Sequence, residues 1–165
     1  MTWSLWGTFG LSYVGLAFML AIEIPNIAWA KRKPTGYDPS GENRALGLIE
    51  RIGQVLCTTA VLLFRDTNPH GWEPWIAWLL AAITLMLLYE GFWLRYFRGP
   101  RSLHDFYRPL LGIPVPGASL PVAAFLLLGI YGRLIPLIVS AVILGIGHIG
   151  IHLSHRAEHR NSGCQ

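Results

Sequence analysis

LIPLIVSAVILGIGHIGIHLS, residues 134–154, contains 21 consecutive positions without Asp, Glu, Lys or Arg. An α-helix of roughly 20 apolar residues is about 30 Å long, which matches the hydrocarbon core of a bilayer. The stretch therefore predicts a membrane-spanning helix. The whole chain agrees, since 53% of its 165 residues are hydrophobic and only 13% are charged. Soluble domains rarely have this composition, so we expect one all-α integral membrane domain over residues 1–165.

Other apolar runs precede this stretch, and their lengths suit four further spans at about residues 5–29, 45–64, 75–97 and 110–131. A polar tail follows at 155–165. The first run could instead be a signal peptide, because Ala28-Trp29-Ala30 resembles a cleavage site. However, no positive charge precedes the run, and it is longer than a signal h-region. The sequence thus predicts a bundle of five transmembrane helices.

The fourth span differs from the others because prolines interrupt it. Proline removes an amide donor and clashes with the preceding helical turn. We therefore expect an extended or re-entrant segment from Leu110 to Ser119, with Ser119 as the helix cap, and a short helix from Pro121 to Tyr131. Irregular backbone at membrane depth must be covered by protein or by a water-filled cavity. Broken spans of this kind frame binding sites in many transporters.

Positive charge is unevenly distributed between the predicted loops. Eleven of the thirteen lysines and arginines fall in or beside the segments 31–44, 98–109 and 155–165, and only Arg65 and Arg133 fall opposite. The positive-inside rule places the first set in the cytoplasm. We expect a multipass protein of the cell membrane with its N-terminus outside and its C-terminus in the cytoplasm. An outer aromatic belt would then comprise Trp3, Trp6, Trp72 and Trp75.

Four ionisable residues lie about seven positions from the cytoplasmic ends of the predicted spans: Glu23, Glu50, Glu90 and His148. At 1.5 Å per residue they share a layer roughly 10 Å below the boundary. Such residues cost about 2.5–3.5 kcal/mol each to insert, so they usually face the bundle interior. We predict Glu50, Glu90 and His148 as catalytic groups. The alternative is structural: Glu50 pairs with an arginine such as Arg51, and Glu23 and Glu90 join helices by hydrogen bonds.

Two polar stripes follow from the helical period. Glu50 and Gln54 share one face of the second span, and the last span aligns His148, His152, His155 and His159 within about 80°. Carboxylate and imidazole groups from several helices suit a divalent metal ion, for which His148, His152 and Glu50 are the candidate ligands. The Glu-x-x-His pair common in helix bundles is absent from the sequence. A metal cofactor therefore stays an open alternative.

Further polar residues lie on the same faces or in the loop 98–108 beside this layer. They are the candidates for substrate binding: Glu23, Asn26, Arg51, Gln54, Tyr89, His104 and Arg108.

These features fit three functions of different classes. The first is an intramembrane enzyme that acts on a lipid or another apolar substrate, with a carboxylate or His148 as general base. The second is a small proton- or cation-coupled transporter or channel, and the third is an accessory subunit whose polar layer only holds the bundle together. The bilayer is the predicted partner, and association of several copies stays open. The basic residues form no single stripe for nucleic acid.

Three short motifs carry a resemblance: Glu-Arg-Ile-Gly-Gln at 50–54, Gly-Ile-Pro-Val-Pro-Gly at 112–117 and Gly-His-Ile-Gly-Ile-His at 147–152. They resemble segments of uncharacterised multipass bacterial membrane proteins. The resemblance implies a membrane helix bundle and no particular activity.

Overall fold

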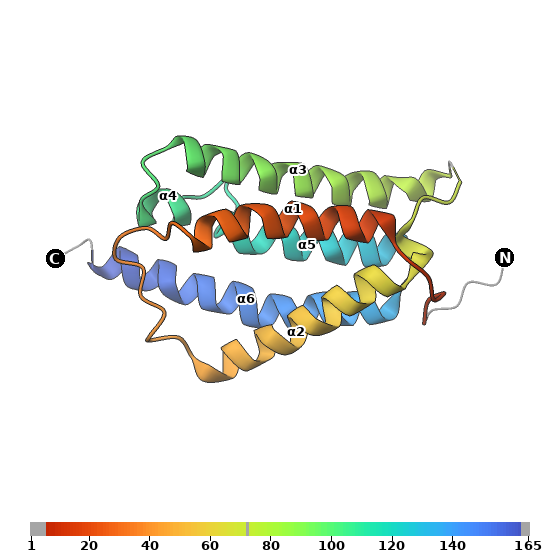
Figure 1. The fold of residues 1–165 in the computed structure, drawn as a ribbon, viewed down its shortest axis with the longest axis horizontal. Helices are drawn as coiled ribbons and strands as arrows, with labels where there is room; N and C mark the ends of the chain where they lie inside the picture. Colours follow the sequence, from red (N-terminus) through yellow and green to blue (C-terminus); the bar gives the residue numbers. More distant parts are fainter. Residues whose placement is uncertain (1–5, 72, 163–165) are drawn as a thin grey trace.

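The computed structural model describes residues 6–71 and 73–162, and within these ranges the regular structure is helical. Five long helices lie side by side and alternate in direction (Figure 1). They are α1 (Tyr13–Ala30), α2 (Arg44–Leu63), α3 (Ala77–Arg98), α5 (Pro116–Tyr131) and α6 (Ile135–Ser162). Shorter turns of helix, η1 (Arg65–Thr67), η2 (Pro74–Ile76) and α4 (Leu103–Tyr107), lie in the connections. The prediction of an all-α helix bundle is confirmed.

Four helical segments of the described ranges are long and apolar enough to cross a membrane: Tyr13–Ala30, Arg44–Leu63, Pro74–Arg98 and Ile135–His159. Their outward faces carry exposed apolar side chains, among them Leu20, Val55, Leu87 and Ile146. In a soluble protein such faces would be unfavourable, whereas lipid tails cover them without cost. Trp3 and Trp72 of the predicted aromatic belt lie outside the described residues.

The first helix begins later than the predicted span, at Tyr13 instead of Leu5. Ser12 caps it, because its hydroxyl accepts a hydrogen bond from the Gly15 amide at 2.7 Å. The described segment before Ser12 instead runs beside the end of α2, where the Gly10 and Ser12 amides donate to the Leu63 and Leu62 carbonyls. This end of α1 is thereby tied to the end of α2.

The helix after the proline-rich segment begins earlier than predicted, at Pro116 instead of Pro121. Val115 has a left-handed conformation with φ 43° and turns the chain into the helix. Pro116 then occupies the first turn, where a missing amide donor costs nothing. Ser119 is therefore not the cap, and its hydroxyl donates to the Pro114 carbonyl at 2.8 Å. Pro121 lies inside α5, and ten of the 16 residues of this helix are buried against its neighbours.

The α2 and α6 helices pack together along much of their length, and glycine permits their close approach. A Cβ atom on Gly147 would lie 2.7 Å from the Glu50 Cα, and one on Gly53 would lie 2.5 Å from the Leu144 Cα. Real Cβ atoms do not approach backbone atoms so closely. The crossing therefore fixes Glu50 of α2 directly beside the turn of α6 that carries His148.

The last helix continues beyond the predicted span end at Ser154 and includes much of the segment 155–165, since α6 reaches Ser162. The loop between α3 and α5 contains α4, which Ser102 caps. The Ser102 hydroxyl and the Asp105 carboxylate exchange hydrogen bonds with each other's amides, which is a capping box.

Candidate functional site

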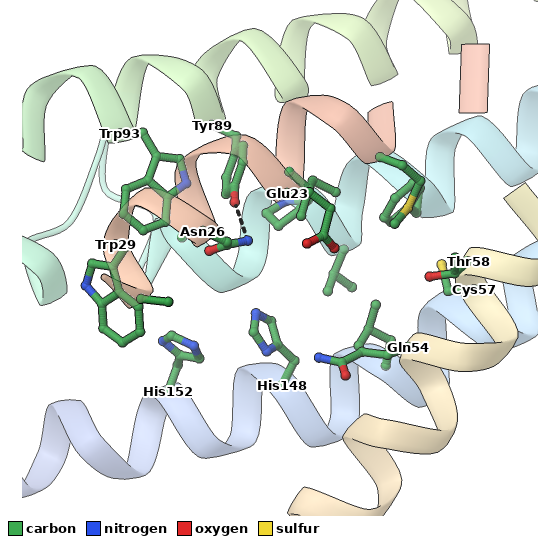
Figure 2. Close-up of a pocket in the computed structure, with 18 of the residues that line it drawn as sticks. Glu23, Asn26, Trp29, Gln54, Cys57, Thr58, Tyr89, Trp93, His148 and His152 are labelled. Carbon is green, nitrogen blue, oxygen red and sulfur yellow. Dashed lines mark hydrogen bonds between the residues drawn. The ribbon is translucent and has the colours of Figure 1, made fainter. Parts of the chain in front are cut away.

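A cavity of about 750 Å³ lies between α1 and the pair α2 and α6, with α3 and α5 forming its back wall. Figure 2 shows His148 and His152 rising from α6 into this space, opposite Asn26 and Trp29 of α1. Six of the predicted site residues line it: Glu23, Asn26, Gln54, Tyr89, His148 and His152. Most other lining residues are apolar or aromatic. Such a cavity, largely apolar with a few convergent polar groups, is typical of a small-molecule site.

The closest polar contact beside the cavity joins Glu50 of α2 to His148 of α6. The Glu50 Oε1 and His148 Nδ1 atoms are 2.5 Å apart, and the two side chains are 19% and 24% exposed. Gln54, one turn further along α2, donates to the same Oε1 atom at 3.3 Å. A carboxylate oxygen accepts, so in the tautomer that makes this hydrogen bond the His148 imidazole carries its proton on Nδ1 and has a lone pair on Nε2. Glu50 therefore orients the His148 ring, and its carboxylate favours this tautomer.

The opposite wall presents an amide and a phenol. Asn26 of α1 donates from Nδ2 to the Tyr89 hydroxyl of α3 at 3.1 Å, as Figure 2 shows. Glu23 lies one turn before Asn26, and its carboxylate also points into the cavity (Figure 2). Among the residues that the structure describes, no hydrogen bond to this carboxylate is present. The wall thus offers both a donor and an acceptor to a bound molecule.

Aromatic side chains close the end of the cavity nearest α4. Trp29 stacks on Phe106 with ring centroids 5.2 Å apart and meets Tyr37 edge-on at 5.0 Å. The His152 ring lies 5.8 Å from Phe106 and 4.7 Å from His148. His152 was a predicted metal ligand, whereas the aromatic residues were missed in the sequence analysis. Helical spacing was the available signal, because Trp29 lies three positions after Asn26, and Trp93, which also lines the cavity, lies four after Tyr89.

The connection between α1 and α2 folds over this aromatic end. Glu42 accepts from His155 of α6 at 2.9 Å, and the Tyr37 ring lies 5.6 Å from the His155 ring. Burial, together with the nearby Glu42 carboxylate, raises the pKa of Tyr37. Burial likewise raises the pKa of Tyr107 in α4. Both phenols therefore stay protonated at neutral pH and are available as donors.

The pKa of Asp105, in the connection between α3 and α5, is lowered and not raised. Its hydrogen bonds with Ser102 lower its pKa, because they favour the charged carboxylate. Asp105 therefore stays ionised and serves α4 as part of the cap.

Five of the predicted site residues do not line the cavity. Glu50 lies beside it through its contact with His148, and the other four lie elsewhere: Glu90, Arg51, His104 and Arg108. Glu90 is half-buried in α3, and its Oε1 atom is buried without a hydrogen-bond partner in the described part of the chain. Arg51 and His104 are exposed. Arg108 contributes its carbonyl oxygen to Arg95, at 2.9 Å.

The predicted metal ligands Glu50, His148 and His152 are close neighbours, but only Glu50 and His148 contact each other through polar atoms. No group of three His, Cys, Asp or Glu side chains in the described ranges has the arrangement needed to hold a metal ion. His152 instead packs its ring against Phe106 and Tyr107. The geometry favours an oriented imidazole over a preformed metal centre.

Comparisons of this chain with protein-family models, with curated proteins and with solved structures gave no match. The functional argument therefore depends on the geometry of the cavity and of the Glu50–His148 pair.

Proposed function

We propose that this protein is a membrane-embedded enzyme that binds an amphipathic, lipid-like substrate in the cavity and uses His148 as its general base. The observation that carries the proposal is the Glu50–His148 hydrogen bond at the wall of a largely apolar cavity. A histidine held by a carboxylate is a recurring arrangement for general-base catalysis. Here the carboxylate and the imidazole come from two helices that glycines bring together.

The chemical role of each group follows from its position. The His148 Nε2 lone pair accepts a proton from a substrate hydroxyl or from a bound water molecule while that oxygen attacks the carbonyl carbon of an ester substrate. The ester C–O bond then breaks, and the leaving alkoxide oxygen takes the proton back from His148. The imidazolium that forms is stabilised by the Glu50 carboxylate on the other ring nitrogen. Asn26 and Tyr89 orient the polar group of the substrate from the opposite wall, and Glu23 accepts a hydrogen bond from it.

The shape of the cavity supports a lipid-like substrate. Its lining includes exposed residues of both helices that flank its mouth, such as Glu23 of α1 and Val55 of α2, the latter 67% exposed. Both helices have the length and composition of membrane spans. An apolar chain can therefore extend from the cavity into the hydrocarbon between α1 and α2, while its polar group lies beside His148.

Comparison of lipid extracts after incubation with the purified protein tests this function. We expect the wild-type protein, in detergent or liposomes, to convert at least one lipid species of the host membrane into a new species detected by mass spectrometry. His148→Gln should leave the extract unchanged, whereas the control His104→Gln, at an exposed position outside the cavity, should retain conversion. An extract that the wild-type protein leaves unaltered would contradict the enzymatic proposal.

We propose further that all five long helices cross the cell membrane, with the start of α1 outside and the end of α6 in the cytoplasm. The alternating helix directions in Figure 1 support this topology. The basic residues that the sequence places where α1, α3 and α6 end support it as well. The 16 residues of α5 span only about 24 Å. A short helix is acceptable there because its neighbours, not lipid, cover most of its surface.

Maleimide labelling of single cysteines tests the topology in a chain carrying Cys57→Ala and Cys164→Ser. We expect Glu73→Cys to react with an impermeant reagent in intact cells, and His104→Cys to react only after permeabilisation. A fluorescent protein fused to the C-terminus should fluoresce, because it folds in the cytoplasm. If residue 104 and the C-terminus were found on opposite sides, α5 would not cross and the five-span topology would be wrong.

A further inference from the structure

A groove separate from the cavity lies on the outside of the bundle, between the C-terminal ends of α1 and α3. It has a volume of about 380 Å³ and shares no residue with the cavity around His148. Its lining is Ile24, Ile27, Ala28, Lys31, Arg32, Phe97 and Arg101. The groove is thus apolar along the helices and basic where they end.

The charge in this groove is unbalanced. It contains three cations and no carboxylate, and within the described ranges Lys31, Arg32 and Arg101 form no ion pair with an acidic side chain. The two helix C-termini together contribute only about one negative charge from their dipoles. The cations therefore prevail, and the groove attracts an anion.

The position of the groove along the membrane-spanning helices indicates the kind of anion that it binds. Lys31 and Arg32 follow directly after the apolar segment Tyr13–Ala30, and Arg101 follows closely after Pro74–Arg98. The three cations therefore lie where a bilayer has its headgroups. Ile24 and Ile27 are 66% and 52% exposed one to two turns deeper, at the level of acyl chains. The backbone of Arg101 is in the left-handed region, with φ 58°. Its side chain is held by a hydrogen bond that Nε donates to the Phe97 carbonyl at 3.2 Å.

We propose that this groove is a binding site for an anionic glycerophospholipid. The phosphate lies among Lys31, Arg32 and Arg101, and one acyl chain lies along Ile24, Ile27 and Phe97. Basic pockets between membrane helices bind anionic headgroups through this combination of charge and apolar contact. A soluble phosphate would gain only the first of these interactions.

Native mass spectrometry of the delipidated full-length protein tests the site with two lipids of identical acyl chains, phosphatidylglycerol and phosphatidylcholine. We expect phosphatidylglycerol to bind more tightly, and each cation replaced by glutamine to weaken that binding roughly fivefold. The triple variant Lys31→Gln, Arg32→Gln, Arg101→Gln should lose the preference. The matched control Arg44→Gln, Arg51→Gln, Arg156→Gln removes the same charge outside the groove and should retain it.

Equal binding of the two lipids by the wild-type protein would overturn the proposal, as would an equal loss of preference in the triple variant and its control. Displacement of phosphatidylglycerol by millimolar glycerol phosphate would also overturn it, since that result indicates a soluble phosphate site. Thermal melting in detergent should be the same for both triple variants, which confirms that they fold. Because the groove shares no residue with the His148 cavity, its test is independent of the enzymatic proposal.

Discussion

Replacing Gly147 by alanine is expected to destabilise the bundle, with a loss of about 1–3 kcal/mol in the free energy of unfolding. The added methyl group would meet the Glu50 backbone, whose Cα would be only 2.7 Å away. Alanine favours a helix over glycine by up to about 1 kcal/mol, but this gain is smaller than the cost of separating two helices. Denaturation of the purified protein in mixed micelles, followed by circular dichroism, measures the difference.

Two glycines serve as controls for this prediction. A Cβ atom at Gly47 of α2 or at Gly91 of α3 would have no heavy atom outside its own helical turn within 4 Å. Gly47→Ala and Gly91→Ala should therefore leave stability unchanged or raise it slightly, so the sign of the effect is opposite to that of Gly147→Ala. Equal stability of all three variants would show that α2 and α6 do not approach as closely as described.

For the proposed role of His148, replacing it by glutamine is expected to lower the turnover of the proposed lipid substrate by about 10²–10⁴-fold, the usual contribution of a general base. Glu50→Gln should have a related effect for a different reason. The new amide can donate to Nδ1, which places the imidazole proton on Nε2 and removes the lone pair that faces the substrate. The measurement is the rate of product formation by mass spectrometry, at saturating substrate and over a range of pH.

His152→Gln is the matched control, because His152 also lines the cavity but has no carboxylate partner in the described structure. We expect it to alter substrate affinity more than turnover. If the His148→Gln variant still binds the substrate, its loss of turnover is due to the missing base and not to a collapsed cavity. If His152→Gln abolished turnover while His148→Gln retained it, the assignment of the base would be wrong.

Much of the fold could be predicted from the sequence because most of the long helices coincide with uninterrupted apolar runs. The start of α5 could not be predicted, because the general effect of proline on helices argues against a helix that continues across Pro121. The structure shows why the rule does not hold here: Pro116 occupies a first turn, and the helix around Pro121 is enclosed by α3 and α6. The late start of α1 likewise depends on the hydrogen bonds of the preceding segment with the end of α2, a contact between distant parts of the chain.

The level of the site residues along the helices could be predicted, but the side of the helix that faces the cavity could be predicted only in part. Glu50 and His148 could be placed at one level by counting residues, and the structure joins them. Tyr89 and Glu90 differ by one position, or 100° around α3. Tyr89 lines the cavity and Glu90 does not, and this choice depends on where the neighbouring helices lie. Helical periodicity gives the angle between two residues, but it does not say which of them faces the cavity.

The ties between α1 and α2 at the end of the bundle where α1 begins also have a mechanical consequence. Backbone hydrogen bonds from Gly10 and Ser12 hold α1 to α2 where α1 begins, whereas at the other end the cavity separates the two helices. At that end α1 is held to α3 and α4 instead, by the Asn26–Tyr89 hydrogen bond and by the stacking of Trp29 on Phe106. The 18 residues of α1, about 27 Å long, therefore join two separate attachments, one to α2 and one to α3 and α4. A change in the angle between α1 and α2 that widened the cavity would have to move α3 and α4 with α1 or break these two contacts.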